Sequence, residues 1–256
     1  MNRKSKNLIG AENFSEQFLP LDGLALPPAG LVHLWFIDLR KLGSPLMLND
    51  EGSQNSELRP RHEKTIRRFY LRLLLGSYLG ISGKDVSISR MVKGKPVLDP
   101  NVHQHQLDFS SAGSDGCCLI GISTAGHIGV DLEQWGRKAG RPLALVRRYF
   151  SSREKERFAE MNDDQIDDAF LHTWACKEAV VKAAGHGIAN QLCRFTVNTN
   201  PVEPAAMLEI EGDKANGWQL AMLEPANGFI GAVALKNDQL HIKGFSLSRR
   251  PEAQDA

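Results

Sequence analysis

The sequence has little cysteine, and none of it falls in a metal-binding or redox pattern. Its 256 residues contain four cysteines, Cys117, Cys118, Cys176 and Cys193. No two have the C-x-x-C spacing of zinc and redox sites, and their arrangement indicates no disulfide framework. We therefore expect free thiols in a reducing, cytoplasmic compartment.

Net charge and long apolar runs are also lacking. Lys and Arg number 31 against 30 Asp and Glu, a formal net charge of +1, so the chain as a whole is not drawn to nucleic acid or membrane. The most apolar early stretch, residues 24–37, is interrupted by Pro27 and Pro28 and is too short to span a bilayer. No apolar segment follows the basic N-terminus, as a signal peptide would require. We expect no nucleic-acid partner and no membrane partner.

Hydrophobic periodicity predicts an α+β protein. Apolar residues recur at i, i+3, i+4 and i+7 in a basic helix over 59–80, and a second helix is predicted over 166–184. Each helix is followed by a glycine and then a strand, which predicts two similar halves related by a pseudo-twofold. Each half would be a small antiparallel sheet packed on a long helix. Strands are predicted at 32–39, 86–92, 118–123, 127–132, 194–198 and within 218–247. The expected domains are a flexible leader (1–30), an N-terminal half (31–127) and a C-terminal half (128–248).

Two carboxylates in Gly129-Val130-Asp131-Leu132-Glu133 form the sharpest local pattern. On a strand, Asp131 and Glu133 project to one face about 6–7 Å apart. They repel each other unless a cation lies between them, and such hard oxygen ligands suit Mg²⁺. The alternative is a solvated edge strand with two surface acids.

A helical motif, Trp174-Ala175-Cys176-Lys177-Glu178-Ala179-Val180-Val181-Lys182, provides the second pattern. Glu178 and Lys182 are i, i+4 neighbours, which in the simplest interpretation form an ordinary helix salt bridge. In the functional interpretation, Lys177, Glu178 and Lys182 lie close together on a partly apolar helix surface and form part of a site.

Further groups suit an anion. Lys95 lies in the Gly-Lys-Pro turn, where proline restricts the preceding residue to extended geometry. Residues 110–113 (Ser-Ser-Ala-Gly) are predicted as a loop whose N–H groups approach a phosphate. An exposed turn lysine and an ordinary serine-rich loop explain the same residues.

In this order, the motifs resemble the Sfp-type 4′-phosphopantetheinyl transferases. The matching landmarks are the basic helix, GKPVL (94–98), DFSSAG (108–113), GVDLE (129–133) and WACKEAVVKAAGHGI (174–188). The resemblance implies coenzyme A in a cleft between the halves, and transfer of its phosphopantetheine arm to a serine of a carrier protein.

The resemblance also implies roles for individual residues. Asp131, Glu133 and Glu178 would bind Mg²⁺, and Glu178 would be the general base. Lys182 would stabilise the leaving phosphate. The remaining coenzyme A contacts would come from Arg59, Arg61, Lys64, Lys95, Ser110, Ser111 and Lys177.

The chain departs from the family at Ser111, where a histidine usually follows the serine of the phosphate loop. A serine hydroxyl hydrogen-bonds but carries no positive charge. The missing histidine keeps open a non-catalytic coenzyme A-binding protein. The same carboxylates acting on a small substrate keep open a metal-dependent phosphohydrolase. A purely structural α+β protein is the remaining alternative.

A basic run between the two motifs suggests a partner. It is either a solvated surface or a patch that steers an acidic acyl or peptidyl carrier protein toward the cleft. Two halves in one chain make a monomer sufficient. The basic residues are Arg137, Lys138, Arg141, Arg147, Arg148, Arg153, Lys155 and Arg157.

Overall fold

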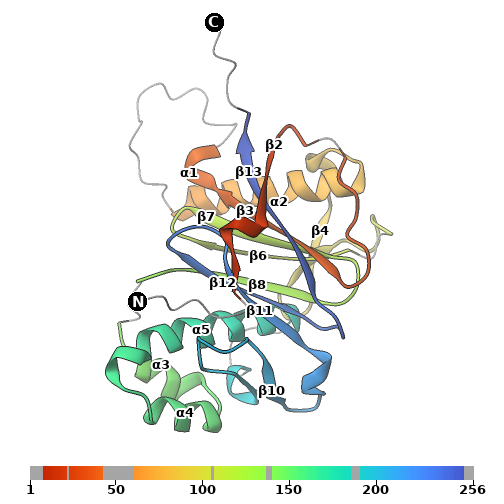
Figure 1. The fold of residues 1–256 in the computed structure, drawn as a ribbon. Coiled ribbons are helices and arrows are strands. Elements are labelled where there is room, and N and C mark those ends of the chain that lie inside the picture. Colours follow the sequence, from red (N-terminus) through yellow and green to blue (C-terminus); the bar gives the residue numbers. More distant parts are fainter. Residues whose placement is uncertain are drawn as a thin grey trace, which may run out of the picture.

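Two helices enclose two facing sheets in the computed structural model. The structure describes residues 8–21, 23–42, 60–104, 107–136, 140–185 and 191–250. Helix α2 (Pro60–Leu79) covers a five-stranded sheet, and helix α5 (Asp163–Ala183) covers a four-stranded sheet (Figure 1). This arrangement confirms the predicted α+β class, while the pseudo-twofold relation of two halves stays a prediction.

The five-stranded sheet has the order β2-β13-β3-β7-β6. Strand β13, the last strand in the sequence, lies between β2 and β3 and runs parallel to both. Strand β7 pairs antiparallel with both β3 and β6. The sheet is therefore mixed rather than antiparallel as predicted, because a C-terminal strand returns to the first sheet. The strands are β2 (Phe14–Leu19), β3 (Leu31–Asp38), β6 (Asp108–Ser114), β7 (Cys117–Ser123) and β13 (His241–Arg249).

The four-stranded sheet has the order β1-β11-β12-β8. Strands β11, β12 and β8 are antiparallel, and the short β1 runs parallel to β11. The turn at 124–126 carries the chain from β7 in one sheet to β8 in the other. The strands are β1 (Ile9–Gly10), β8 (Ile128–Gln134), β11 (Gln219–Glu224) and β12 (Phe229–Leu235).

Smaller elements complete the described fold. Two short hairpins pair β4 with β5 and β9 with β10. The remaining elements are α1 (Leu39–Leu42), β4 (Ile88–Arg90), β5 (Pro96–Leu98), α3 (Pro142–Tyr149), α4 (Ser152–Ala159), β9 (Phe195–Val197), β10 (Met207–Ile210) and the 3-10 turns η1 (Ala11–Asn13), η3 (Gly83–Asp85), η4 (Leu192–Arg194) and η5 (Ala215–Gly217).

Strand alternation divides the core into layers. On β3, Trp35 and Ile37 pack with Tyr70 and Leu74 of α2, while Leu34 on the opposite face packs between the sheets. Successive strand residues point to opposite faces, so one apolar strand serves two cores. A third core joins α5 to β11 and β12, where small residues such as Ala179 and Ala232 are buried.

Two sequence predictions differ from the structure. Residues 9–19 of the expected leader form β1, η1 and β2, and both strands pair with strands from the end of the chain. Residues 110–113, expected as a loop, belong to strand β6, because their small side chains fit between β7 and the neighbouring elements. Arg59 and the predicted loop at 50–57 lie outside the described residues. Among the described residues, no helix combines the length and apolarity that a membrane crossing requires.

Candidate active site

Asp131, Glu178 and Lys182 come together where β8 packs against α5. The Lys182 ammonium lies 2.6 Å from Asp131 Oδ1 and 3.9 Å from Glu178 Oε2. Asp131 and Glu178 are buried, at 5% and 7% exposure. The structure thus brings together three of the side chains selected from the sequence.

A glycine sets the distance between the strand and the helix. Gly129 is two residues before Asp131 on β8, so both face α5. A Cβ at position 129 would lie 1.9 Å from the Ala179 carbonyl oxygen and 2.4 Å from the Ala183 nitrogen. Only a residue without a side chain permits this approach, which brings Asp131 within reach of Lys182.

Negative charge in the cluster is incompletely balanced. Burial, together with the nearby Asp131 and Glu133, raises the pKa of Glu178 to about 7 against the opposing effect of Lys182. Burial also raises the pKa of Asp131, although Lys182 and a hydrogen bond from the Leu132 backbone oppose the shift. Asp131 Oδ2 is buried without a hydrogen-bond donor. A bound cation would stabilise the ionised forms of both carboxylates.

The chemistry of this donor set fits Mg²⁺. Asp131, Glu133 and Glu178 offer carboxylate oxygens, which are the ligands that Mg²⁺ prefers. Asp131 Oδ2, buried without a hydrogen-bond donor, could accept a bond from a cation. Within the described residues, no three His, Cys, Asp or Glu side chains are grouped closely enough to hold a metal ion as they stand. Metal binding would therefore require these side chains to lie closer together than they do here.

Lys177 is separated from this cluster. Its ammonium is fully buried and lies 2.7 and 2.8 Å from the two oxygens of Glu154 and 2.7 Å from the Phe195 carbonyl oxygen. All three of its donors are satisfied. The resemblance implied a phosphate contact for Lys177, but the structure gives it a structural ion pair, because α4 supplies a buried carboxylate beside α5.

Lys95 is also buried in an ion pair. Its ammonium contacts Asp108 Oδ2 at 2.5 Å and the carbonyl oxygens of Ile128 at 3.1 Å and Ala183 at 3.5 Å. A phosphate contact by Lys95 would therefore have to displace Asp108. Sequence reasoning missed Asp108; the only available signal was its place two residues before Ser110.

The other candidates lie on β6 and α2. Ser110 is buried and its Oγ accepts a hydrogen bond from the Val130 N–H at 3.1 Å, so it links the two sheets. Ser111 is half-buried and faces the α2 side, since it pairs with Ile120 of that core. Arg61 and Lys64 are exposed on the first turns of α2.

Arg67 is a cation that the sequence analysis did not select. A Cβ built on Gly113, two residues beyond Ser111 on the same face of β6, would lie 2.2 Å from Arg67 Nη1 and 3.2 Å from Glu63 Oε1. The Arg67 guanidinium therefore lies over this face of β6. The Arg67-Arg68 pair in the basic helix was its only sequence signal.

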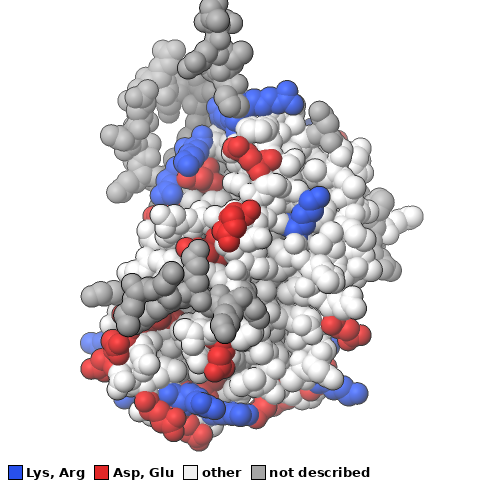
Figure 2. All heavy atoms as spheres, viewed as in Figure 1, with Lys and Arg blue, Asp and Glu red and all other residues white. Residues whose placement is uncertain are grey.

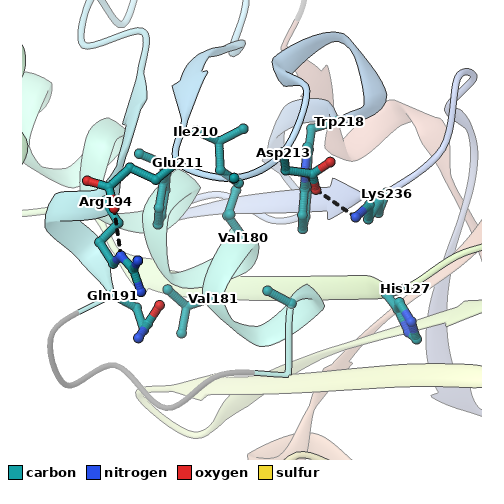
Figure 3. A pocket seen from close by; sticks show the side chains of 13 residues that line it. His127, Val180, Val181, Gln191, Arg194, Ile210, Glu211, Asp213, Trp218 and Lys236 are labelled. Atoms are coloured by element: carbon teal, nitrogen blue, oxygen red, sulfur yellow. Dashed lines mark hydrogen bonds and ion pairs between the residues drawn. The ribbon is translucent and has the colours of Figure 1, made fainter.

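A separate cavity of about 300 Å³ lies on another face of α5 (Figure 3). Val180 and Val181 line it together with Trp218, and ion pairs Asp213–Lys236 and Glu211–Arg194 flank it, at 2.6 and 2.8 Å. Among the described residues that line it, Arg194, Glu211, Asp213 and Lys236 are already paired, in contrast to the Asp131 cluster.

Comparison with known proteins places the Asp131 cluster within a family match. Residues 127–234 match the model of the 4′-phosphopantetheinyl transferase superfamily. The chain is 32% identical over 213 residues to the 4′-phosphopantetheinyl transferase HetI of Nostoc sp., covering 80% of this chain and 87% of HetI. It is 31% identical over 154 residues to a putative 4′-phosphopantetheinyl transferase of Synechocystis sp., covering 60% and 61% of the two chains. It is 28% identical over 140 residues to the 4′-phosphopantetheinyl transferase ffp of Bacillus subtilis, covering 53% and 58%.

Proposed function

Because the chain belongs to the 4′-phosphopantetheinyl transferase superfamily, we propose that it transfers the 4′-phosphopantetheine group of coenzyme A to a serine of an apo carrier protein. The second product is adenosine 3′,5′-bisphosphate. The observation that carries this proposal is the buried Asp131–Lys182–Glu178 cluster, which lies inside the region of the family match.

Asp131, Glu133 and Glu178 are the residues that would hold Mg²⁺. When bound there, the ion would polarise the pyrophosphate of coenzyme A and neutralise charge that develops on it. The unpartnered Asp131 Oδ2 and the raised pKa values of Asp131 and Glu178 support this assignment.

Glu178 is suited to accept the proton of the carrier serine. Its buried carboxylate lies 3.9 Å from the Lys182 ammonium, at the place where the serine proton would be released. The serine oxygen forms a bond to the β-phosphorus of coenzyme A, the bridging P–O bond on its far side breaks, and the proton passes to Glu178. Lys182, already between the two carboxylates, would neutralise the departing phosphate.

Coenzyme A binding is assigned to the groups around β6 and the start of α2. Ser111, Arg61, Lys64 and the newly identified Arg67 are accessible to a phosphate. Arg59 belongs to the same proposal on sequence grounds alone. Lys177 is withdrawn from it, because its donors are fully used in the interior.

For the partner, the location and the assembly state we propose what the sequence predicts. We assign an acidic acyl or peptidyl carrier protein as the acceptor, because several exposed arginines lie on α3 and α4. A cytoplasmic monomer accords with the free cysteines and with a site built from one chain.

The test is intact-mass spectrometry of apo carrier proteins incubated with the protein, coenzyme A and Mg²⁺. We expect a gain of one phosphopantetheine that is lost with EDTA and falls at least about 100-fold in Glu178→Gln. Glu156→Gln, an exposed change on α4, is the matched control and should retain activity.

Each alternative has its own outcome. Coenzyme A that stays bound without modifying any carrier class would indicate a binding protein. Release of phosphopantetheine into water would indicate a phosphohydrolase. Near-normal turnover of Glu178→Gln would remove Glu178 from the role of base.

A further inference from the structure

Lys95 and Asp108 form a buried junction between elements that are far apart in sequence. Asp108 Oδ2 accepts from Lys95 Nζ at 2.5 Å and from the Ile128 N–H at 2.8 Å. The same ammonium donates to the carbonyl oxygens of Ile128 and Ala183. The pair therefore connects the β4–β5 hairpin, β6, β8 and the end of α5.

The junction holds the two elements that carry the reactive groups. Ile128 begins β8, which bears Asp131, and its N–H and carbonyl are both fixed by this pair. Ala183 ends α5 and directly follows Lys182. A change at the junction would therefore alter the distance between Asp131 and Lys182 without touching either side chain.

Lys95 is poorly placed to bind a phosphate. Its ammonium has three donors, and the structure gives each of them an acceptor. Removing it from Asp108 would leave a half-buried carboxylate with a weakened set of donors, at a cost in free energy. Among the described residues, the exposed His127 is a further titratable group facing the pair, and its Nδ1 lies 3.6 Å from Asp108 Oδ2.

We infer that Lys95 and Asp108 are positioning residues, which set β8 against the end of α5 so that Asp131 and Lys182 meet at the transfer site. The inference rests on the proposed function. It predicts a kinetic signature opposite to that of a phosphate ligand. Loss of a positioning residue lowers kcat, whereas loss of a uniform binding contact raises KM.

Steady-state kinetics of Lys95→Met and Asp108→Asn test the inference. We expect Lys95→Met to lower kcat by about 10- to 100-fold, because misplacement by about 1 Å costs that much, with KM for coenzyme A within about twofold of wild type. Asp108→Asn should have the same signature with a smaller loss, since an amide oxygen can still accept from Ile128. Lys84→Met, an exposed lysine in η3, is the matched control and should be unchanged.

Hydrogen exchange at the end of α5 gives a readout independent of turnover. The amides of Ala184 and Gly185, which donate to Val180 and Lys182 carbonyls, should exchange faster in both variants than in wild type and the control. A rise of about tenfold or more in KM for coenzyme A with unchanged kcat would overturn the inference, as would unchanged kinetics and exchange. If the wild-type protein transfers nothing, the proposed function is refuted. Hydrogen exchange would still show whether Lys95 and Asp108 hold β8 against the end of α5.

Discussion

Lys177 and Glu154 show what a buried charge does when it is fully paired. Both side chains have no exposed surface, and Glu154 also accepts hydrogen bonds from the N–H groups of Ser151 and Val197. The Lys177 ammonium lies 4.2 Å from the centre of the Phe195 ring, which adds a cation–π contact. This pair fixes α4 and β9 against α5, one residue away from Glu178.

We predict that Lys177→Met destabilises the fold by about 3–5 kcal/mol, because it leaves the Glu154 carboxylate buried without its cation. The Lys177→Met/Glu154→Gln double variant should be less destabilised than the sum of the single variants, since the two groups interact directly. Urea unfolding followed by circular dichroism measures all three. A loss below about 1 kcal/mol in Lys177→Met would contradict the structural role.

A second residue-scale prediction concerns His172, which is 1% exposed on α5. Burial lowers its pKa to about 4, against a hydrogen bond to the Asn198 carbonyl oxygen that raises it. The unfolded chain takes up a proton near pH 6.5, whereas native His172 stays neutral until about pH 4. Stability from this residue is therefore present above pH 6.5 and is lost as the pH falls toward 4, by up to about 3 kcal/mol.

Thermal or urea unfolding between pH 7 and pH 4 tests this dependence. We expect His172→Gln to lose less stability than wild type over that interval, whatever its stability at pH 7. The exposed His62→Gln is the control and should keep the wild-type slope. His33, whose pKa burial also lowers to about 4, contributes a similar loss that remains in both variants. Parallel slopes for wild type and His172→Gln would refute the assignment.

At the scale of elements, α5 was predictable and its neighbours were not. Its apolar periodicity, and Gly185 with a φ of +69°, define the helix and its end from local sequence. The Glu154–Lys177 pair joins residues 23 positions apart, and neither is marked by a pattern that distinguishes a buried ion pair from an exposed one. The same limit applies to Lys95, because only the fold places Asp108 beside it.

The strands also divide into those that local sequence predicts and those that depend on distant pairing. Strands β3, β11 and β12 were predictable from their apolar and β-branched residues. Asp131, Glu178 and Lys182 were selected from the motifs that resemble the family. The short β1 and β2 were missed, because both run parallel to strands more than 200 residues away. Such pairing leaves no turn signal in the local sequence.

Helix α3 carries the prediction about the partner. Arg147 and Arg148 are exposed, and the Arg148 guanidinium lies 5.1 Å from the centre of the Tyr149 ring. Basic and acidic side chains lie side by side at the lower end of the molecule, toward α3 and α4 (Figure 2). Any steering of an acidic carrier must therefore come from individual arginines rather than from a uniform field.

We predict that Arg147→Glu/Arg148→Glu lowers kcat/KM for the carrier by about tenfold, while KM for coenzyme A stays unchanged. The loss should shrink at high ionic strength, because salt screens exposed charges. Lys84→Glu/Lys214→Glu reverses two exposed charges elsewhere and is the matched control. Equal losses toward carrier and coenzyme A would count against a docking role for α3.

At the scale of the whole molecule, each sheet combines strands from the beginning and the end of the chain. Strand β13, from the end of the chain, pairs with both β2 and β3, and β1, from the beginning, pairs with β11. Phe245 and Leu247 of β13 are part of the core beneath α2. The predicted division at residues 127 and 128 therefore separates sequence segments whose strands complete one another.

We predict that residues 1–127 do not fold alone, because removing β13 leaves β2 without its partner and exposes an edge of β3 in the apolar core. Co-expression with residues 128–256 should give a soluble complex that unfolds in one cooperative transition. Far-UV circular dichroism and thermal unfolding of each fragment and of the pair are the measurements. The control is residues 1–127 joined by a flexible linker to residues 238–250, which restores β13 and should recover structure in the first sheet. Cooperative unfolding of residues 1–127 by themselves would show that this half is an independent domain, and that β13 only extends a sheet already stable without it.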